Sequence, residues 1–360
     1  MRNGGGANLP RLEAAIIGAG PAGAMAALSL KRSMPNSNVH LIERLDEGKY
    51  PRYHKMCGEG ISRKGLELLD IDYDKFVVNR ISRAIEHWPG GIDIETALDG
   101  LIIDRPGLLN ALMEEFRSRG GEIIRGNLHD IDITRKGVRS KLSDGSTLTT
   151  DYLVGADGSR SLVREKIFGE QDIDLIWTEQ YVLKGNGPRD AIEFFYDERY
   201  KGGYRWSFPN GENTRIGFPK GTDAAPGDAL EMHRRAIPIG TVKRLVLGGI
   251  CLVGDAAAQA NPLTFGGLRT AFTAGWMAGE AIAREDLGSY QDLWRSSPYA
   301  DPIFKRGYDM ICAMDNEQLR VSVEPFRKGY TGARATLAML RQPKYLQLYR
   351  SFERSMEFGW

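Results

Sequence analysis

One thiol with a basic neighbour lies in the stretch YHKMCGEGIS, residues 53–62. Cys57 follows Lys55 by two positions, and Gly58 and Gly60 come after it. A thiol near a cation can donate a proton, and glycines let the backbone approach a ligand closely. The simpler interpretation is a small buried side chain in a packed core, which describes most free cysteines. The stretch therefore makes Cys57 and Lys55 candidate catalytic residues and predicts Cys57 and Gly58 beside a ligand.

The segment from residue 12 to residue 43 has the order strand, glycine turn, helix, strand, acid. The apolar run LEAAII leads into GAGPAG, residues 18–23, and then into a helix-forming stretch. The glycines permit the tight turn, the approach of the backbone to a pyrophosphate and close packing of the helix on the strand. The next strand ends at Glu43, where a carboxylate can accept hydrogen bonds from an adenosine ribose. The dinucleotide-binding residues predicted here are Gly18, Gly20, Pro21, Ala22, Gly23 and Glu43.

Two later segments are also expected to be buried strands that end in glycine and aspartate. They are DYLVGADGSRSLVR, residues 151–164, and VLGGICLVGD, residues 246–255. The second is followed by PLTFGG, residues 262–267, and by a long Ala/Gly-rich helix. Asp255 could bind a polyol hydroxyl, and the first N–H groups of that helix could stabilise negative charge on a reduced ring. Each segment taken alone could equally be an ordinary strand–turn–helix connection.

In this order the three segments resemble the FAD-binding signature of the para-hydroxybenzoate hydroxylase-like flavoprotein superfamily. The resemblance implies FAD rather than a nicotinamide cofactor. LIIDRPGLLNAL, residues 101–112, is similar to the part of that superfamily in which an arginine precedes a helix beside the flavin. The cofactor residues predicted outside the first motif are Cys57, Gly58, Arg105, Asp157, Gly158, Gly254, Asp255, Pro262, Gly266 and Gly267.

Two further stretches resemble the geranylgeranyl reductase family, whose archaeal members are digeranylgeranylglycerophospholipid reductase-like. GYRWSFPNGENTRIG, residues 203–217, looks like the YxWxFP motif of that family, and KMCGEGIS is similar to its K-x-C-G-x-G-x-S segment. Strand alternation would put three aromatic side chains of the first stretch on one face. The resemblance implies a reductase that saturates isolated C=C bonds of a prenyl lipid with a hydride from reduced FAD and a proton. The predicted substrate-binding residues are Tyr204, Trp206, Phe208 and Pro209.

Two other functions remain compatible with these residues. The first is a flavin-dependent aromatic monooxygenase, or a related halogenase-like enzyme, of the same fold. The second is a non-catalytic flavin-binding or electron-transfer protein. The sequence has a single strand–glycine–helix motif of the dinucleotide type, so the electrons must come from outside, either from NAD(P)H or from a ferredoxin-like protein.

Composition limits the partners and the location. The 48 Lys and Arg residues are balanced by 47 Asp and Glu residues, which gives no reason to expect a nucleic acid. The three cysteines and five histidines have no metal-ligand spacing, so no metal site is expected. No apolar run reaches the roughly 18–20 residues that cross a bilayer, and a cytoplasmic protein is expected. Residues 327–354 contain seven basic residues and one acid, which is typical of a solvated face or of peripheral contact with an anionic membrane.

The order of the motifs predicts an α/β protein. We expect a discontinuous Rossmann-like FAD-binding domain with an inserted mixed β-sheet substrate domain and a C-terminal helical region. The expected boundaries are 1–10 for a flexible N-terminus, 11–76, 101–172 and 220–288 for the FAD-binding domain, 77–100 and 173–219 for the substrate-binding sheet, and 289–360 for the helical region.

Overall fold

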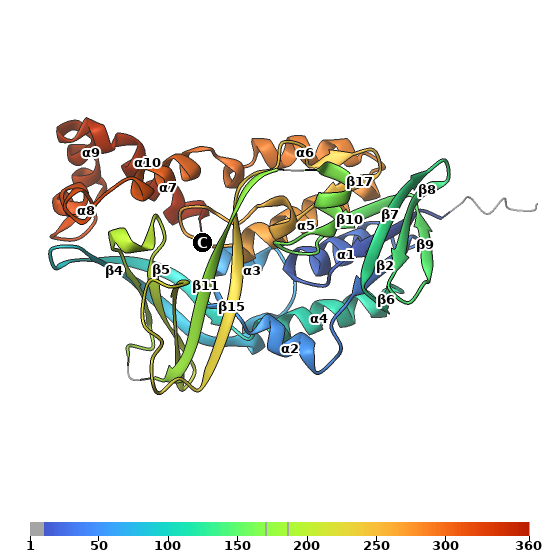
Figure 1. Ribbon diagram of the computed structural model, residues 1–360, viewed down its shortest axis with the longest axis horizontal. Coiled ribbons are helices and arrows are strands. Elements are labelled where there is room, and N and C mark those ends of the chain that lie inside the picture. The colour runs from blue at the N-terminus through green and yellow to red at the C-terminus, as the bar shows by residue number, and fades with distance from the viewer. Residues whose placement is uncertain (1–10, 170, 186, 360) are drawn as a thin grey trace, which may run out of the picture.

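The computed structural model describes residues 11–169, 171–185 and 187–359 (Figure 1). The predicted flexible N-terminus, residues 1–10, lies outside these described residues. Helices and strands alternate over the first part of the chain and helices follow at the end, so the predicted α/β class is confirmed. The α-helices are α1 (Pro21–Ser33), α2 (Lys49–His54), α3 (Arg63–Glu67), α4 (Arg105–Ser118), α5 (Leu268–Ala283), α6 (Leu287–Ser296), α7 (Ile303–Cys312), α8 (Asn316–Val323), α9 (Gly332–Arg341) and α10 (Leu346–Phe358).

A six-stranded sheet carries the three predicted nucleotide segments. β1 lies inside it and pairs in parallel with β2 on one side and β10 on the other, and β10 pairs in parallel with β17. The carboxyl ends of these strands therefore meet at one edge, where α/β proteins bind their ligands. In spatial order the strands are β16 (Val246–Leu247), β17 (Ile250–Leu252), β10 (Tyr152–Gly155), β1 (Glu13–Ile17), β2 (Asn38–Glu43) and β6 (Glu122–Arg125).

The prediction of a single apolar strand over residues 246–255 is wrong. This segment forms two short antiparallel strands, β16 and β17, joined by a turn at Gly248 and Gly249. Gly248 has φ +58°, a backbone conformation that residues with a Cβ rarely adopt. The glycine pair thus reverses the chain before β17, and the Gly254–Asp255 corner still follows a strand of the sheet.

An eight-stranded sheet stands beside the first one. It is mixed, as predicted, because β12 pairs in parallel with β4, while all other pairs of neighbouring strands in this sheet are antiparallel. It also takes in β3 and β15, which come from outside the ranges expected for the substrate sheet. The extent of a sheet does not define a folding unit, so the domain boundaries stay a prediction. In spatial order the strands are β15 (Glu231–Thr241), β11 (Asp172–Lys184), β14 (Asn213–Pro219), β13 (Arg205–Asn210), β12 (Ala191–Phe195), β4 (Val77–Trp88), β5 (Ile92–Ile103) and β3 (Gly60–Ser62).

The two ends of the molecule are formed by different elements (Figure 1). A three-stranded sheet lies at one end, and helices α7 to α10 lie at the other. Trp88 of the eight-stranded sheet and Tyr196, directly after β12, pack against Phe352 of α10, and all three belong to one hydrophobic cluster with residues of these helices. Within the part of the chain that the structure describes, no helix has the length and apolar character needed to span a bilayer. The small sheet consists of β7 (Leu128–Thr134), β8 (Gly137–Leu142) and β9 (Thr147–Thr150).

Helices α1 and α5 pack with their backbones almost in contact. A Cβ at Gly275 would collide with the Ala22 carbonyl oxygen, and a Cβ at Gly279 would lie 2.6 Å from the Ala26 carbonyl oxygen. Real Cβ atoms do not approach that closely, so only glycine fits at these positions of α5. Since both helices begin beside the nucleotide segments, this packing fixes the distance between their N-termini.

Substituting Gly275 tests this close approach. Gly275→Ala should lower the free energy of unfolding by about 1–3 kcal/mol, because the added methyl group forces the helices apart. Gly332→Ala is the matched control, since an added Cβ at Gly332 meets no atom within 4 Å. The control should be neutral or stabilising by up to ~1 kcal/mol, the helix-propensity gain of alanine over glycine. Urea unfolding followed by far-UV circular dichroism measures both, and equal stability of the two variants would contradict the packing.

Candidate active site

A cavity of about 710 Å³ is bordered by the carboxyl ends of β1, β2, β10 and β17 and by residues of β11, β13 and β15. Its size is within the range of roughly 300–1,000 Å³ that is usual for ligand sites. The cavity therefore brings together segments that lie far apart in the sequence. The predicted site residues that line it are Gly18, Gly20, Pro21, Ala22, Glu43, Cys57, Gly58, Arg105, Asp157, Gly158, Tyr204, Trp206, Phe208, Gly254, Asp255, Gly266 and Gly267.

Four predicted residues do not line the cavity: Gly23, Lys55, Pro209 and Pro262. Gly23 packs helix α1 on the preceding turn, because a Cβ there would collide with the Gly18 carbonyl oxygen. Pro209 is buried in β13. Lys55 follows α2 with an exposed side chain, so the structure does not bring it to the cavity with Cys57. Its catalytic role stays a prediction that no contact in the structure supports.

The first glycine turn and Glu43 form one end of the cavity. Gly18 has φ +97°, and a Cβ on it would lie 2.5 Å from the Ala156 carbonyl oxygen. A Cβ on Gly20 would meet only the His54 ring, at 3.7 Å, so the space beside Gly20 is open to a ligand. The buried Glu43 carboxylate accepts hydrogen bonds from the Ala19 N–H (2.9 Å) and the Leu45 N–H (2.7 Å). The acid is thus held rigidly where a ribose would lie.

The Gly254–Asp255 corner is also tied down by side chains. Gln259 Oε1 accepts a hydrogen bond from the Gly254 N–H at 2.6 Å, and Arg164 Nη1 donates to the Ala256 carbonyl at 2.8 Å. Burial raises the pKa of the Asp255 carboxyl, and the positive charges of nearby arginines oppose that rise. Helix α5 begins directly after Gly267 and its first residues line the cavity, so its N-terminus can stabilise negative charge there.

Asp157 has a structural task beside the cavity. Its carboxylate accepts hydrogen bonds from the Ser161 hydroxyl (2.5 Å), the Leu162 N–H (2.7 Å) and the Val163 N–H (3.1 Å). It therefore caps the turn that follows β10, and burial raises its pKa while these hydrogen bonds lower it. A direct contact between Asp157 and a ligand stays a prediction.

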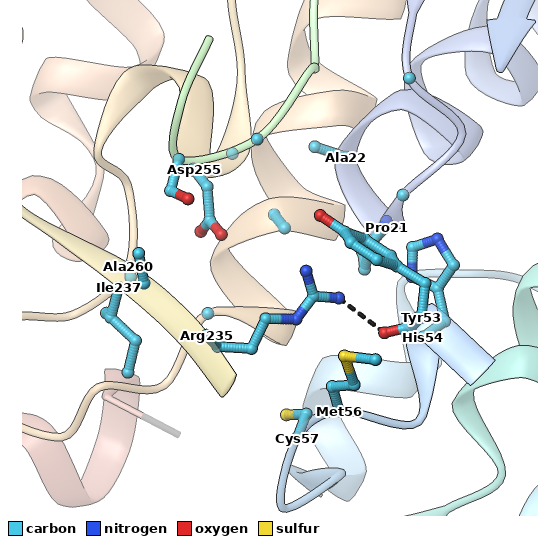
Figure 2. A pocket seen from close by; sticks show the side chains of 18 of the residues that line it. Pro21, Ala22, Tyr53, His54, Met56, Cys57, Arg235, Ile237, Asp255 and Ala260 are labelled. Carbon is cyan, nitrogen blue, oxygen red and sulfur yellow. Dashed lines mark hydrogen bonds between the residues drawn. The ribbon is translucent and has the colours of Figure 1, made fainter. Parts of the chain in front are cut away.

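Arginines hold the irregular segment that carries Cys57. Arg235 Nη2 donates to the Tyr53 carbonyl at 2.6 Å, and its guanidinium lies 3.4 Å from the centre of the Tyr53 ring. Figure 2 shows Arg235 between this carbonyl, where the dashed line ends, and the part of the cavity that carries Asp255. Arg105 Nε donates to the His54 carbonyl at 2.6 Å. Sequence reasoning predicted Arg105 but missed Arg235.

A third arginine binds the same segment closer to the thiol. Arg215, on β14, donates from Nη1 to the Lys55 carbonyl (3.1 Å) and to the Cys57 carbonyl (2.7 Å), and it forms an ion pair with Glu59. Burial raises the pKa of the Glu59 carboxyl, and the guanidinium of Arg215 opposes the rise. Neither residue was predicted. The available signal was an arginine at an inward-facing position of a strand, which requires a buried partner.

Gly58 has a neighbour that the sequence did not reveal. A Cβ on Gly58 would lie 2.7 Å from the ring of Phe208, so the missing side chain makes room for that ring. Gly58 also lines the cavity, and its contact with a ligand stays a prediction.

Tyr204, Trp206 and Phe208 form an apolar wall of the cavity, called here the aromatic wall. All three side chains are buried, and each contributes to the lining. The Tyr204 ring stacks on Phe265 with centroids 5.4 Å apart, and its hydroxyl donates to the Thr264 carbonyl. Burial raises the pKa of Tyr204, so its hydroxyl stays protonated and uncharged. The wall presents carbon atoms and rings, which suit an apolar ligand.

The residues present fit an FAD molecule. Open space at Gly20 lies next to the N-terminus of α1, where a pyrophosphate binds well, and Glu43 is placed for the adenosine ribose. Arg105 Nη2 is buried and has no hydrogen-bond partner in the part of the chain that the structure describes, which suits an anionic group beside it. Asp255 and the N-terminus of α5 are available to the ribityl chain and the ring.

Known proteins agree with this assignment. Residues 100–178 match a protein family described as FAD binding domain. The chain is 30% identical to digeranylgeranylglycerophospholipid reductase 2 of Methanopyrus kandleri, over 86% of this chain and 89% of that protein. It is 29% identical to digeranylgeranylglycerophospholipid reductase of Methanothrix thermoacetophila, over 80% of this chain and 84% of that protein.

Solved structures share the fold. A geranylgeranyl bacteriochlorophyll reductase-like protein from Thermoplasma acidophilum superposes with a TM-score of 0.78 and 20% identity, over 96% of this chain and 99% of that one. HpxO of Klebsiella pneumoniae, solved with FAD and uric acid, superposes with a TM-score of 0.69 and 17% identity, over 95% and 97% of the two chains. The predicted cofactor, FAD, and the predicted oxidoreductase class are confirmed. By its identity to the reductase of Methanopyrus kandleri over most of both chains, the chain belongs to the digeranylgeranylglycerophospholipid reductase family.

Proposed function

We propose that this protein is an FAD-dependent reductase that saturates isolated carbon–carbon double bonds of a prenyl lipid. The observation that carries the proposal is the shared cavity, in which the aromatic wall and the residues that fit FAD line one space. An apolar chain could lie along the wall with a double bond next to the flavin ring. The names of the curated relatives support a geranylgeranyl lipid as the substrate class.

The reaction forms two C–H bonds at the expense of one π bond. Bound FAD, once reduced, supplies the hydride. The residues of this chain orient the lipid along the aromatic wall, exclude water and bring a proton to the second carbon. Cys57 is the proposed donor, because its thiol is half-buried in a segment that borders the cavity. The electrons come from an outside donor, either NAD(P)H or a ferredoxin-like protein.

Helix α9 offers a surface for lipid membranes. Leu337 and Leu340 are 44% and 75% exposed and lie three positions apart, on one face of the helix. Arg341 and Lys344 are exposed next to them. The combination of exposed leucines with cations, in a stretch with almost no acids, suits the surface of an anionic membrane. We propose that this face brings the enzyme to membranes that contain its substrate.

Anaerobic turnover tests the function directly. The flavin of the purified protein is reduced, and a geranylgeranyl glycerophospholipid in detergent is added without oxygen. The flavin should reoxidise faster than in the lipid-free control, and mass spectrometry should find products that have gained pairs of hydrogen atoms. Reoxidation at the lipid-free rate would contradict the proposal. NAD(P)H consumption that needs oxygen and is stimulated by a phenol would favour the monooxygenase instead.

The role of the thiol is tested with Cys57→Ser. A serine hydroxyl is a much weaker acid than a thiol, so kcat should fall by about 10²-fold or more, in the range of a lost general acid, while FAD remains bound. Cys312→Ser is the control, because Cys312 lies on α7 and its thiol donates to the Lys201 carbonyl, away from the lining of the cavity. A wild-type rate in Cys57→Ser would return this residue to a packing role.

Membrane contact is tested by placing charges on α9. The double variant Leu337→Glu/Leu340→Glu should lose most of its co-sedimentation with phosphatidylglycerol vesicles. It replaces two apolar side chains that would insert between the lipids by carboxylates that the anionic lipids repel. Leu293→Glu on α6 is the control, because Leu293 is similarly exposed (43%) on another helix. If both proteins sediment like the wild type, α9 is not the membrane-binding face.

A further inference from the structure

Glu59 has a backbone conformation that residues with a Cβ avoid. Its φ is +60°, in the left-handed region, where the Cβ crowds the backbone. The residue is only 1% exposed. Its carbonyl accepts a hydrogen bond from the Ile103 N–H at 3.1 Å, so β5 holds this conformation in place. Strain of this kind persists where the surroundings fix it, and it gathers at functional sites.

The strained turn sets the surroundings of the Cys57 thiol. The Glu59 N–H lies 3.4 Å from Cys57 Sγ and donates to it. On the other side of the turn, Arg215 binds the Cys57 carbonyl and pairs with the Glu59 carboxylate. The main chain of Glu59 thus contacts the Cys57 thiol directly, and its side chain acts on the Cys57 carbonyl through Arg215.

Arg215 and the aromatic wall belong to neighbouring strands. Arg215 on β14 is the cross-strand partner of Phe208 on β13. Phe208 fills the space that Gly58 leaves open, while Arg215 holds Cys57 and Glu59, the residues on either side. The backbone of residues 57–59 is therefore fastened to the same patch of the sheet that forms the wall.

Stability alone does not explain this ion pair. Buried pairs are often replaceable by apolar residues without loss of stability, because desolvation offsets their attraction. Here the pair leaves polar atoms unsatisfied, since Glu59 Oε1 and Arg215 Nε are buried and have no hydrogen-bond partner among the described residues. A pair that contributes little to stability but binds the backbone at Cys57 is suited to fixing geometry.

We propose that Glu59 and Arg215 are positioning residues that hold the Cys57 thiol at a fixed place relative to the aromatic wall. The catalytic consequence rests on the proposed function, in which Cys57 gives its proton to a lipid lying on that wall. The positioning itself does not rest on it, because it concerns the thiol and the wall alone.

The test uses the FAD-loaded protein and removes the pair as a whole. Glu59→Gln/Arg215→Met leaves no unpaired buried charge, so the protein should fold. Iodoacetamide should alkylate Cys57 about fivefold faster than in the wild type, because the thiol is no longer held. Peptide mass spectrometry measures the rate, with Cys312 of the same molecule as the internal reference. The matched control is Glu212→Gln/Arg189→Met, which removes an exposed ion pair from two loops that connect strands of the same sheet.

Turnover of the lipid gives the second readout. In the double variant, kcat should fall by about 10–100-fold with little change in KM, as expected when a reacting group is misplaced while binding is kept. Arg215→Lys keeps the positive charge beside Glu59 but not the guanidinium geometry, and it should recover only part of the rate.

The outcomes separate the two proposals. Faster alkylation together with a lower kcat supports both. Faster alkylation with a wild-type kcat supports the positioning and contradicts the catalytic role of Cys57. Alkylation at the wild-type rate in both the double variant and Arg215→Lys overturns the positioning, whatever the turnover.

Discussion

Four carbonyl groups of residues 53–57 accept hydrogen bonds from arginine side chains of distant parts of the chain. The segment contains the end of α2 and the irregular backbone after it. The Tyr53 and Lys55 carbonyls also accept local backbone N–H groups, and buried acceptors in such a segment use side-chain donors as well. Arg235, Arg105 and Arg215 supply them from β15, the start of α4 and β14. Because two of these donors come from the eight-stranded sheet, the segment that carries Cys57 is fastened to the sheet that carries the aromatic wall. Hydrogen bonds therefore join two parts of the cavity lining that lie far apart in the sequence.

The three arginines bring several positive charges close together, and the site contains carboxylates that offset part of this charge. Glu59 pairs with Arg215, and the Asp255 carboxyl lies near Arg235 and Arg105. Arg105 still has a buried nitrogen without a partner among the residues that the structure describes. The N-termini of α1 and α5 add further positive potential on the same cavity. An FAD carries a pyrophosphate and can take up negative charge on its ring, so the cofactor completes an electrostatic arrangement that the polypeptide leaves positive.

Local signals in the sequence were sufficient to predict the glycine turn, Glu43 and the aromatic wall, but not Arg215 and Arg235, which hold residues 53–57. The turn at Gly18 and the acid at Glu43 follow from strand, turn and helix chemistry within some thirty residues, and they line the cavity as expected. The missed arginines depend on which strands become neighbours, a non-local property that periodicity does not contain. Gly58 shows the same limit, because its spacing indicated a missing Cβ but not that Phe208 would occupy the space. The reversal at Gly248 had a local signal, because a Gly-Gly pair inside an apolar run marks a turn, and the prediction of one strand passed over it.

The fold by itself does not select the reaction. HpxO, which was solved with FAD and uric acid, has the same architecture as this chain. What these proteins share is the architecture, so the chemistry must be decided by the side chains that face the ring. Here the cavity is lined by an aromatic wall and by Cys57, next to a strained, buried turn. A wall made largely of aromatic rings suits an isolated alkene, whose reduction needs close contact, a hydride and one proton.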